Sequence, residues 1–139
     1  MLKRNKKEND IHEGLTISVG GKFEIGESPE DCVIREVKEE TNLDIIKPKL
    51  RGIITFPNFD GNKDWYTYVF TAKEYTGDLT KDCNEGDLVW VKKNEIQNIK
   101  TWEGDYIFLD WLVQDKPFFS AKFNYKDNKF IDYEVTFYD

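Results

Sequence analysis

Three glutamates lie close together in one short stretch of the chain, Glu36, Glu39 and Glu40. In a helix, residues at i, i+3 and i+4 share one side, so these carboxylates would converge. Two unit charges 4 Å apart repel by roughly 4 kcal/mol at an effective dielectric near 20, and a bound cation relieves that repulsion. Oxygen ligands suit Mg²⁺, with Mn²⁺ as a substitute, better than zinc. On charge spacing alone, however, a solvated acidic face supported by an Arg35–Glu39 pair explains the pattern more simply.

Helix start and stop signals flank these glutamates. Ser28 can serve as the N-cap, Pro29 suits the first helical position, and Asp31 completes a pair that resembles a capping box. Asn42 tolerates the left-handed conformation that ends many helices. The sequence therefore predicts a helix between Ser28 and Asn42, preceded by a glycine-rich turn at Gly20 and Gly21.

The stretch from Gly21 to Leu43 resembles the Nudix box, G-x5-E-x7-R-E-U-x-E-E-x-G-U, where U is a bulky aliphatic residue. Eight of the nine fixed positions match: Gly21, Glu27, Arg35, Glu36, Val37, Glu39, Glu40 and Leu43. Asn42 replaces the second glycine, a mild change because both residues accept positive φ at a helix end. A match of this length at fixed spacing is a specific signal.

The resemblance implies a role for each residue of the box. The expected metal ligands are Gly20 through its carbonyl, Glu36, Glu39, Glu40 and, outside the box, Glu85. Either Glu36 or Glu39 would orient or deprotonate the attacking water. Arg35 would position a neighbouring carboxylate, and Glu27 is the expected partner. Gly21, Glu27 and Asn42 would support the motif structurally, whereas Glu85 could equally be a turn carboxylate beside Gly86.

The same resemblance implies how the base would be bound. Trp102 and Asp105 fall where related enzymes hold a purine by stacking and hydrogen bonding, although Trp102 could equally be a core residue at a helix start. Ile17 stands where an Asn contacts the base in relatives, and Gly104 stands where some have a second Asp. Both departures weaken the transfer of specificity for 8-oxoguanine.

Two basic residues are candidates for contacting phosphate. Lys22 lies in the glycine-rich turn and could equally be an exposed side chain. Arg4 belongs to the polar segment 1–13, whose simpler interpretation is a solvated chain end with a frayed start.

Composition bounds the class of protein. The 139 residues suit one domain covering 1–139, and a net charge of −7 argues against stable nucleic-acid binding. No apolar run is long enough to span a membrane, no secretory signal is visible, and two cysteines are typical of free thiols in a cytoplasmic protein. A small-molecule nucleotide is the expected partner. The oligomeric state, monomer or homodimer, stays open.

Hydrophobic periodicity predicts an α+β fold. We expect strands at 14–23, 47–56, 65–74 and 87–92, a brief helix or turn at 93–99, an amphipathic helix at 102–114, and a hairpin within 118–137. Turn residues at 57–62 should connect the second and third strands. Two main helices would flank a mixed sheet, and the resemblance implies the same arrangement, a Nudix α/β/α sandwich. The strand that usually opens the family's fold is missing before Met1, which suggests a late start.

The resemblance, which is to bacterial MutT-type 8-oxo-dGTP diphosphatases, also implies the reaction. We expect Mg²⁺-dependent hydrolysis of a nucleoside triphosphate, such as 8-oxo-dGTP, to the monophosphate and pyrophosphate, which sanitises the nucleotide pool and serves DNA repair. ADP-ribose, a dinucleoside polyphosphate or the 5′ end of RNA are alternative substrates. A nucleotide-binding module without catalysis is a third interpretation, disfavoured because every carboxylate of the box is present.

Overall fold

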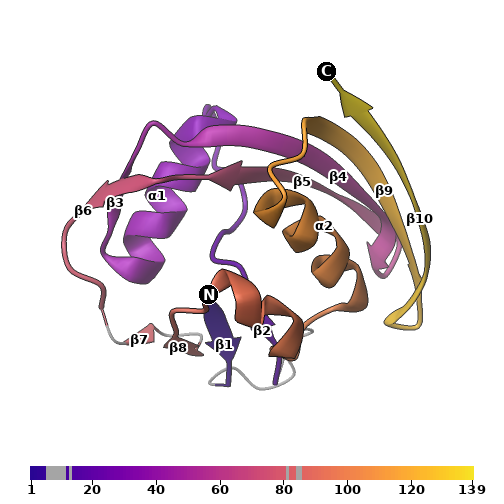
Figure 1. The fold of residues 1–139 in the computed structure, drawn as a ribbon, viewed down its shortest axis with the longest axis horizontal. Helices are drawn as coiled ribbons and strands as arrows, with labels where there is room; N and C mark the ends of the chain where they lie inside the picture. Colours follow the sequence, from indigo (N-terminus) through magenta and orange to yellow (C-terminus); the bar gives the residue numbers. More distant parts are fainter. Residues whose placement is uncertain (6–11, 13, 81, 84–85) are drawn as a thin grey trace. The chain divides into compact units, whose positions relative to one another are not determined.

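A computed structural model describes residues 1–5, 12, 14–80, 82–83 and 86–139. The chain divides into two compact units. Figure 1 labels the helices and strands along the ribbon. Unit 1 comprises Met1–Pro48 and Ala72–Thr101, and unit 2 comprises Lys49–Thr71 and Trp102–Asp139.

Helix α1 (Pro29–Thr41) is the main helix of unit 1, and its ends confirm the predicted signals. The Ser28 hydroxyl accepts a hydrogen bond from the Asp31 N–H at 3.0 Å, and the Asp31 carboxylate accepts one from the Ser28 N–H at 3.1 Å. Asn42 ends the helix in the left-handed conformation, with φ at 67°. Cys32 and Val37 are buried, so one face of α1 packs while another carries the glutamates.

Short antiparallel strands complete unit 1. One sheet has the order β2-β1-β8-β7, formed by β1 (Leu2–Arg4), β2 (Thr16–Ile17), β7 (Asp82–Cys83) and β8 (Gly86–Leu88). A second contains β3 (Asp44–Ile46) and β6 (Glu74–Thr76), and η1 (Lys93–Asn98) is the predicted brief helix.

Three predictions for unit 1 were wrong. Leu2–Arg4 is a strand paired on both sides, and Leu2 is 1% exposed, so this part of the segment 1–13 is no frayed end. Only Thr16–Ile17 of the strand expected at 14–23 forms, and the strand expected at 87–92 is Gly86–Leu88. These short strands depend on their partners in the sheet, and β1 and β8 pair across more than 80 residues, which local propensity does not report.

Unit 2 is a mixed four-stranded sheet in the order β10-β9-β4-β5. Its strands are β4 (Lys49–Asp60), β5 (Lys63–Thr71), β9 (Phe118–Lys126) and β10 (Lys129–Tyr138). The pair β4–β9 is parallel, and the other two pairs are antiparallel hairpins. The β9–β10 hairpin was predicted, whereas the turn expected at 57–62 narrows to Gly61 and Asn62 because β4 continues to Asp60 through an irregular register.

Helix α2 (Glu103–Val113) packs on this sheet through aromatic side chains and confirms the predicted amphipathic helix. The Trp111 ring lies 5.0 Å from Phe119 and 5.9 Å from Phe123, measured between ring centroids. Phe119 and Phe123 are 1% and 0% exposed. The ring of Phe119 packs against the backbone of Gly52 on β4, where any larger residue would collide with it. The core of unit 2 therefore fixes α2 on β9, and Phe119 of β9 packs in turn against β4.

Candidate active site

Arg35 lies at the centre of a cluster of glutamates on α1 and in the loop that precedes it. Its Nε and Nη2 donate to the two oxygens of Glu27 at 2.7 and 2.9 Å. Its Nη1 donates to Glu36 at 2.8 Å and to Glu39 at 3.2 Å, and lies 3.6 Å from Glu24. A planar guanidinium with five donors suits such a set of acceptors, which an ammonium would not.

The charges in this cluster shift two pKa values in opposite directions. The Arg35 guanidinium, together with the Glu24 backbone, lowers the pKa of Glu27 to about 2. Hydrogen bonds to Glu27 and Glu36 raise the pKa of Arg35 above its ordinary value. The side chains of Arg35, Glu27 and Glu36 are 21%, 13% and 15% exposed, so little water screens these contacts. The pair between Arg35 and Glu27 therefore stays ionised at neutral pH.

The turn at Gly20 and Gly21 contacts the same face of α1. The Gly20 N–H donates to the Glu40 carboxylate at 3.0 Å. The Glu36 carboxylate lies directly over Gly21, where a Cβ atom would collide with all three atoms of the carboxyl group. A side chain at position 21 would therefore push the Glu36 carboxylate out of this place, and glycine admits it. The turn brings the Gly20 backbone to the side of the helix that carries Glu36 and Glu40.

These residues fit a divalent cation by donor chemistry. Glu36, Glu39 and Glu40 supply carboxylate oxygens, and the Gly20–Gly21 turn supplies backbone close by. Arg35 uses one oxygen of Glu36 and one of Glu39, and a carboxylate with two oxygens can bind an arginine and a cation together. Within the described ranges, no three His, Cys, Asp or Glu side chains already surround a common point: Glu36 and Glu39 contact Arg35, whereas Glu40 contacts the Gly20 N–H.

The other residues predicted for unit 1 lie in different environments. Lys22 is exposed, and its carbonyl accepts a hydrogen bond from Arg35 Nη2 at 3.0 Å. Arg4 on β1 and Ile17 on β2 are half-buried residues of neighbouring strands. Glu85 lies outside the described residues. Lys22 is thus tied to the glutamate cluster through its backbone, and its side chain projects into solvent.

In unit 2, Trp102 and Asp105 lie in the same helix start, where the Asp105 N–H donates to the Trp102 carbonyl at 3.0 Å, but their burial differs. Trp102 is 9% exposed, and its ring lies edge-to-face with Phe59 and Tyr125 at 5.0 and 5.5 Å between centroids. This favours the interpretation of Trp102 as a core residue at the helix start. Asp105, in the first turn of α2, is half-buried and so less enclosed than Trp102. Phe59 and Tyr125 were missed because only pairing within the sheet brings them to Trp102.

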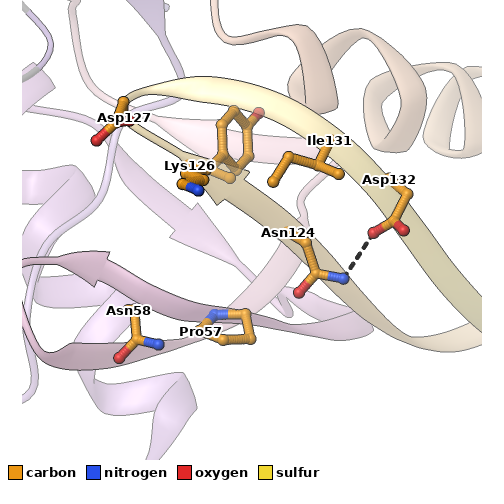
Figure 2. Close-up of a pocket in the computed structure, with 8 residues that line it drawn as sticks. Pro57, Asn58, Asn124, Lys126, Asp127, Ile131 and Asp132 are labelled. Carbon is orange, nitrogen blue, oxygen red and sulfur yellow. Dashed lines mark hydrogen bonds between the residues drawn. The ribbon is translucent and has the colours of Figure 1, made fainter.

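An open hollow of about 570 Å³ also lies in unit 2, near the turn between β9 and β10 (Figure 2). Side chains from three strands line it: Pro57, Asn58, Asn124, Tyr125, Lys126, Asp127, Ile131 and Asp132. In Figure 2, Asn124 points toward Asp132, and its amide donates to that carboxylate at 2.7 Å. The parallel pairing of β4 with β9 ends at Thr55 and Lys122, so the hollow opens where these strands cease to pair.

The comparisons with known proteins establish the family. The family model of the NUDIX domain matches residues 1–112, which includes the whole glutamate cluster. The chain therefore belongs to the Nudix family. It is a Nudix hydrolase of MutT type, a pyrophosphohydrolase with an α+β sandwich fold, and Nudix hydrolases generally use divalent metal ions.

Two relatives illustrate the range of the family. An uncharacterised Nudix hydrolase, YvcI of Bacillus subtilis, is 39% identical over 115 residues, which are 81% of this chain and 73% of the relative. An ADP-ribose pyrophosphatase of Methanocaldococcus jannaschii is 34% identical over 107 residues, 77% of this chain and 63% of the relative. The curated relatives thus leave the substrate open.

Solved structures agree with the fold. A MutT protein from Bacillus halodurans superimposes with a TM-score of 0.85 and 30% identity, over 96% of this chain and 86% of that one. A MutT structure from a study of Aliivibrio salmonicida and Vibrio cholerae has a TM-score of 0.63 and 21% identity, over 79% and 82%, and supports the fold alone. No helix in the described part of the chain is long and apolar enough to cross a membrane.

Proposed function

We propose that this enzyme hydrolyses a nucleoside triphosphate to the monophosphate and pyrophosphate with Mg²⁺, and that its preferred substrate is an oxidised purine nucleotide such as 8-oxo-dGTP. The observation that carries this proposal is the cluster of Glu27, Glu36 and Glu39 around Arg35, with Glu40 held by Gly20. The similarity to the MutT protein of Bacillus halodurans, over 96% of this chain, supports an enzyme of MutT type, and the sequence resemblance to MutT-type 8-oxo-dGTP diphosphatases implies the triphosphate.

The residues that would hold Mg²⁺ are Glu36, Glu39, Glu40 and the carbonyl of Gly20, with Glu85 as a further candidate. When bound there, Mg²⁺ or Mn²⁺ would offset charge on the phosphate oxygens and lower the pKa of a bound water. Arg35 keeps Glu36 and Glu39 in place, and Glu27 keeps Arg35 in place through two hydrogen bonds. Positioning of this kind supplies much of the rate in phosphoryl chemistry.

Glu39 is the better candidate for handling the attacking water. Its side chain is 58% exposed, whereas that of Glu36 is 15% exposed and packs over Gly21. A general base must reach the proton it takes, directly or through one water. We therefore assign Glu36 to metal binding alone and Glu39 to metal binding and proton transfer.

On the substrate side, Asp105 would hydrogen-bond the base, since it is only half-buried at the start of α2, while Trp102 supports the first turn of α2 from within the core. Lys22 and Arg4 would contact phosphate. Ile17 stands where relatives have an Asn that contacts the base, and it would make an apolar contact with the base instead of a hydrogen bond. Hydrolysis of damaged nucleotides would sanitise the precursor pool for DNA synthesis.

ADP-ribose is the second candidate substrate. The observation in its favour is the similarity to the ADP-ribose pyrophosphatase of Methanocaldococcus jannaschii, at 34% identity. The residues around Arg35 would serve both substrates, because both contain a pyrophosphate linkage. Discrimination between 8-oxo-dGTP and ADP-ribose would therefore depend on the side chains that contact the base or the second sugar.

A panel of nucleotides tests the proposal. Purified protein is incubated with 8-oxo-dGTP, dGTP, dATP and ADP-ribose, each with Mg²⁺ and with excess EDTA, and products are separated by ion-exchange chromatography. We expect the highest kcat/KM with 8-oxo-dGTP, release of pyrophosphate, and loss of activity in EDTA. Turnover of ADP-ribose alone would move the assignment to the second candidate, and no turnover of any compound would refute both.

A further inference from the structure

The first turn of α2 is held by a side chain from a distant strand. The hydroxyl of Tyr125 on β9 accepts a hydrogen bond from the backbone N–H of Gly104 at 2.8 Å. Its ring contacts Trp102 at 5.5 Å and Phe59 at 5.4 Å between centroids, both edge-to-face. Trp102 has no side-chain hydrogen bond to cap the helix, so Tyr125 satisfies one of the N–H groups that a helix start leaves unpaired.

The hydrogen bond between Gly104 and Tyr125 depends on the lack of a side chain at position 104. A Cβ atom at position 104 would lie 2.7 Å from the Tyr125 hydroxyl and 2.6 Å from the ring of Phe123. Distances this short do not occur between real Cβ atoms and their neighbours, so any side chain there would displace Tyr125 or Phe123. The absence of a side chain at 104 is what admits the phenol to the helix backbone.

The Tyr125 hydroxyl also lies in the electrostatic environment of Asp105. Burial raises the pKa of Tyr125 most, and the charges of Asp105 and Glu103 raise it further, against the lowering by the Gly104 bond. The phenol therefore stays protonated throughout the neutral range. Tyr125 also lines the open hollow near the β9–β10 turn. Tyr125 is thus half-buried between the helix backbone and solvent-accessible space.

We propose that Tyr125 is a positioning residue for specificity: by holding the Gly104 N–H, its hydroxyl sets the place of the neighbouring Asp105 carboxylate and so governs discrimination between purine bases. This rests on the proposed function, in which Asp105 contacts the base. The glutamate cluster around Arg35 does not include Tyr125. Removal of the hydroxyl should therefore alter KM and base selectivity and leave kcat nearly unchanged.

The test compares the kinetics of Tyr125→Phe with those of the wild-type enzyme on two purine triphosphates. One is the triphosphate that the wild type hydrolyses best, and the other is the oxidised or non-oxidised counterpart of that compound. One hydrogen bond contributes about three- to tenfold in an equilibrium. We expect KM to rise about three- to tenfold, kcat to stay within about twofold, and the ratio of kcat/KM between the two bases to fall by a similar factor. Gly104→Ala should change the same quantities in the same direction.

Tyr133→Phe is the matched control. Tyr133 lies on β10, its ring also contacts Phe123, and it is 43% exposed, but the Gly104 N–H donates to Tyr125 and not to Tyr133. We expect this variant to keep the wild-type KM and selectivity. Thermal unfolding of all variants separates lost stability from altered specificity, since a merely structural role would lower Tm without changing the base ratio.

The outcomes distinguish the two proposals. If the wild type discriminates between purines and Tyr125→Phe retains its KM and base ratio, the positioning role is refuted while the proposed function stands. An equal change in Tyr133→Phe would refute it too, because the effect would not be specific to the Gly104 bond. If the wild type hydrolyses no purine nucleotide, both proposals fail together.

Discussion

Arg35 and Glu27 form a two-pronged ion pair, with Nε to Oε2 at 2.7 Å and Nη2 to Oε1 at 2.9 Å. The pair joins helix α1 to the loop that precedes it. The third guanidinium nitrogen of Arg35, Nη1, donates to Glu36 and Glu39. Glu27 therefore acts on the candidate metal ligands through Arg35. This relationship gives the box residue Glu27 a physical role without contact to metal or substrate.

Replacement of Arg35 by Lys should lower activity because an ammonium cannot donate to Glu27 in two parallel bonds and reach Glu36 as well. We expect kcat to fall by roughly ten- to 100-fold, as is typical when catalytic groups move by about 1 Å. Steady-state kinetics with Mg²⁺ measures this. Lys38→Arg, an exchange of cations on the same helix, serves as the control, and an equal loss there would contradict the argument.

The pH dependence of stability should report the ion pair. Glu27 has its pKa lowered from 4.5 to about 2 in the folded protein, so its contribution is complete above pH 4.5 and is lost as pH falls toward 2. Glu27→Gln removes this titration. Urea unfolding at several pH values should therefore show a steeper loss of stability between pH 4.5 and 2 in the wild type than in Glu27→Gln. Parallel curves would show that the pair contributes nothing.

Glu39→Gln should lower kcat by about 10²-fold or more while the fold is retained, because the amide neither takes a proton nor offers a charged ligand. Glu30→Gln is the matched control, since Glu30 is an exposed residue in the first turn of the same helix. Circular dichroism verifies folding of both variants. Wild-type activity in Glu39→Gln would remove Glu39 from the site.

Thr41 should be important for stability at the end of α1. It is 4% exposed, its hydroxyl donates to the Val37 carbonyl at 2.6 Å, and it accepts from the Leu43 N–H at 3.1 Å. Thr41→Val keeps the shape and leaves the Leu43 N–H buried without this acceptor, which costs about 1–3 kcal/mol. Thr41→Ser keeps the hydroxyl and should lose less. Equal losses in urea unfolding would show that packing, not hydrogen bonding, matters.

Local signals predicted the parts of the fold that depend on neighbours in sequence. Each cap of α1 involves residues no more than four positions apart: Ser28 with Asp31 at the start, and Asn42 with Lys38 at the end. The structure contains both caps as predicted. The amphipathic pattern of α2 and the β9–β10 turn were predicted for the same reason. By contrast, β1 and β8 pair across more than 80 residues, and no local pattern indicates such a partner.

The sequence by itself determined the family, the chemistry and the candidate metal ligands, because the box is a contiguous stretch of fixed spacing on one helix. Tertiary structure alone decided the rest. It buried Trp102 beneath Phe59 and Tyr125, left Asp105 half-buried, and joined Tyr125 to Gly104 across 21 residues. These relationships depend on which strand lies beside which and on the absence of a Cβ at 104. The close approach of Tyr125 to the Gly104 backbone arises only when the sheet is formed.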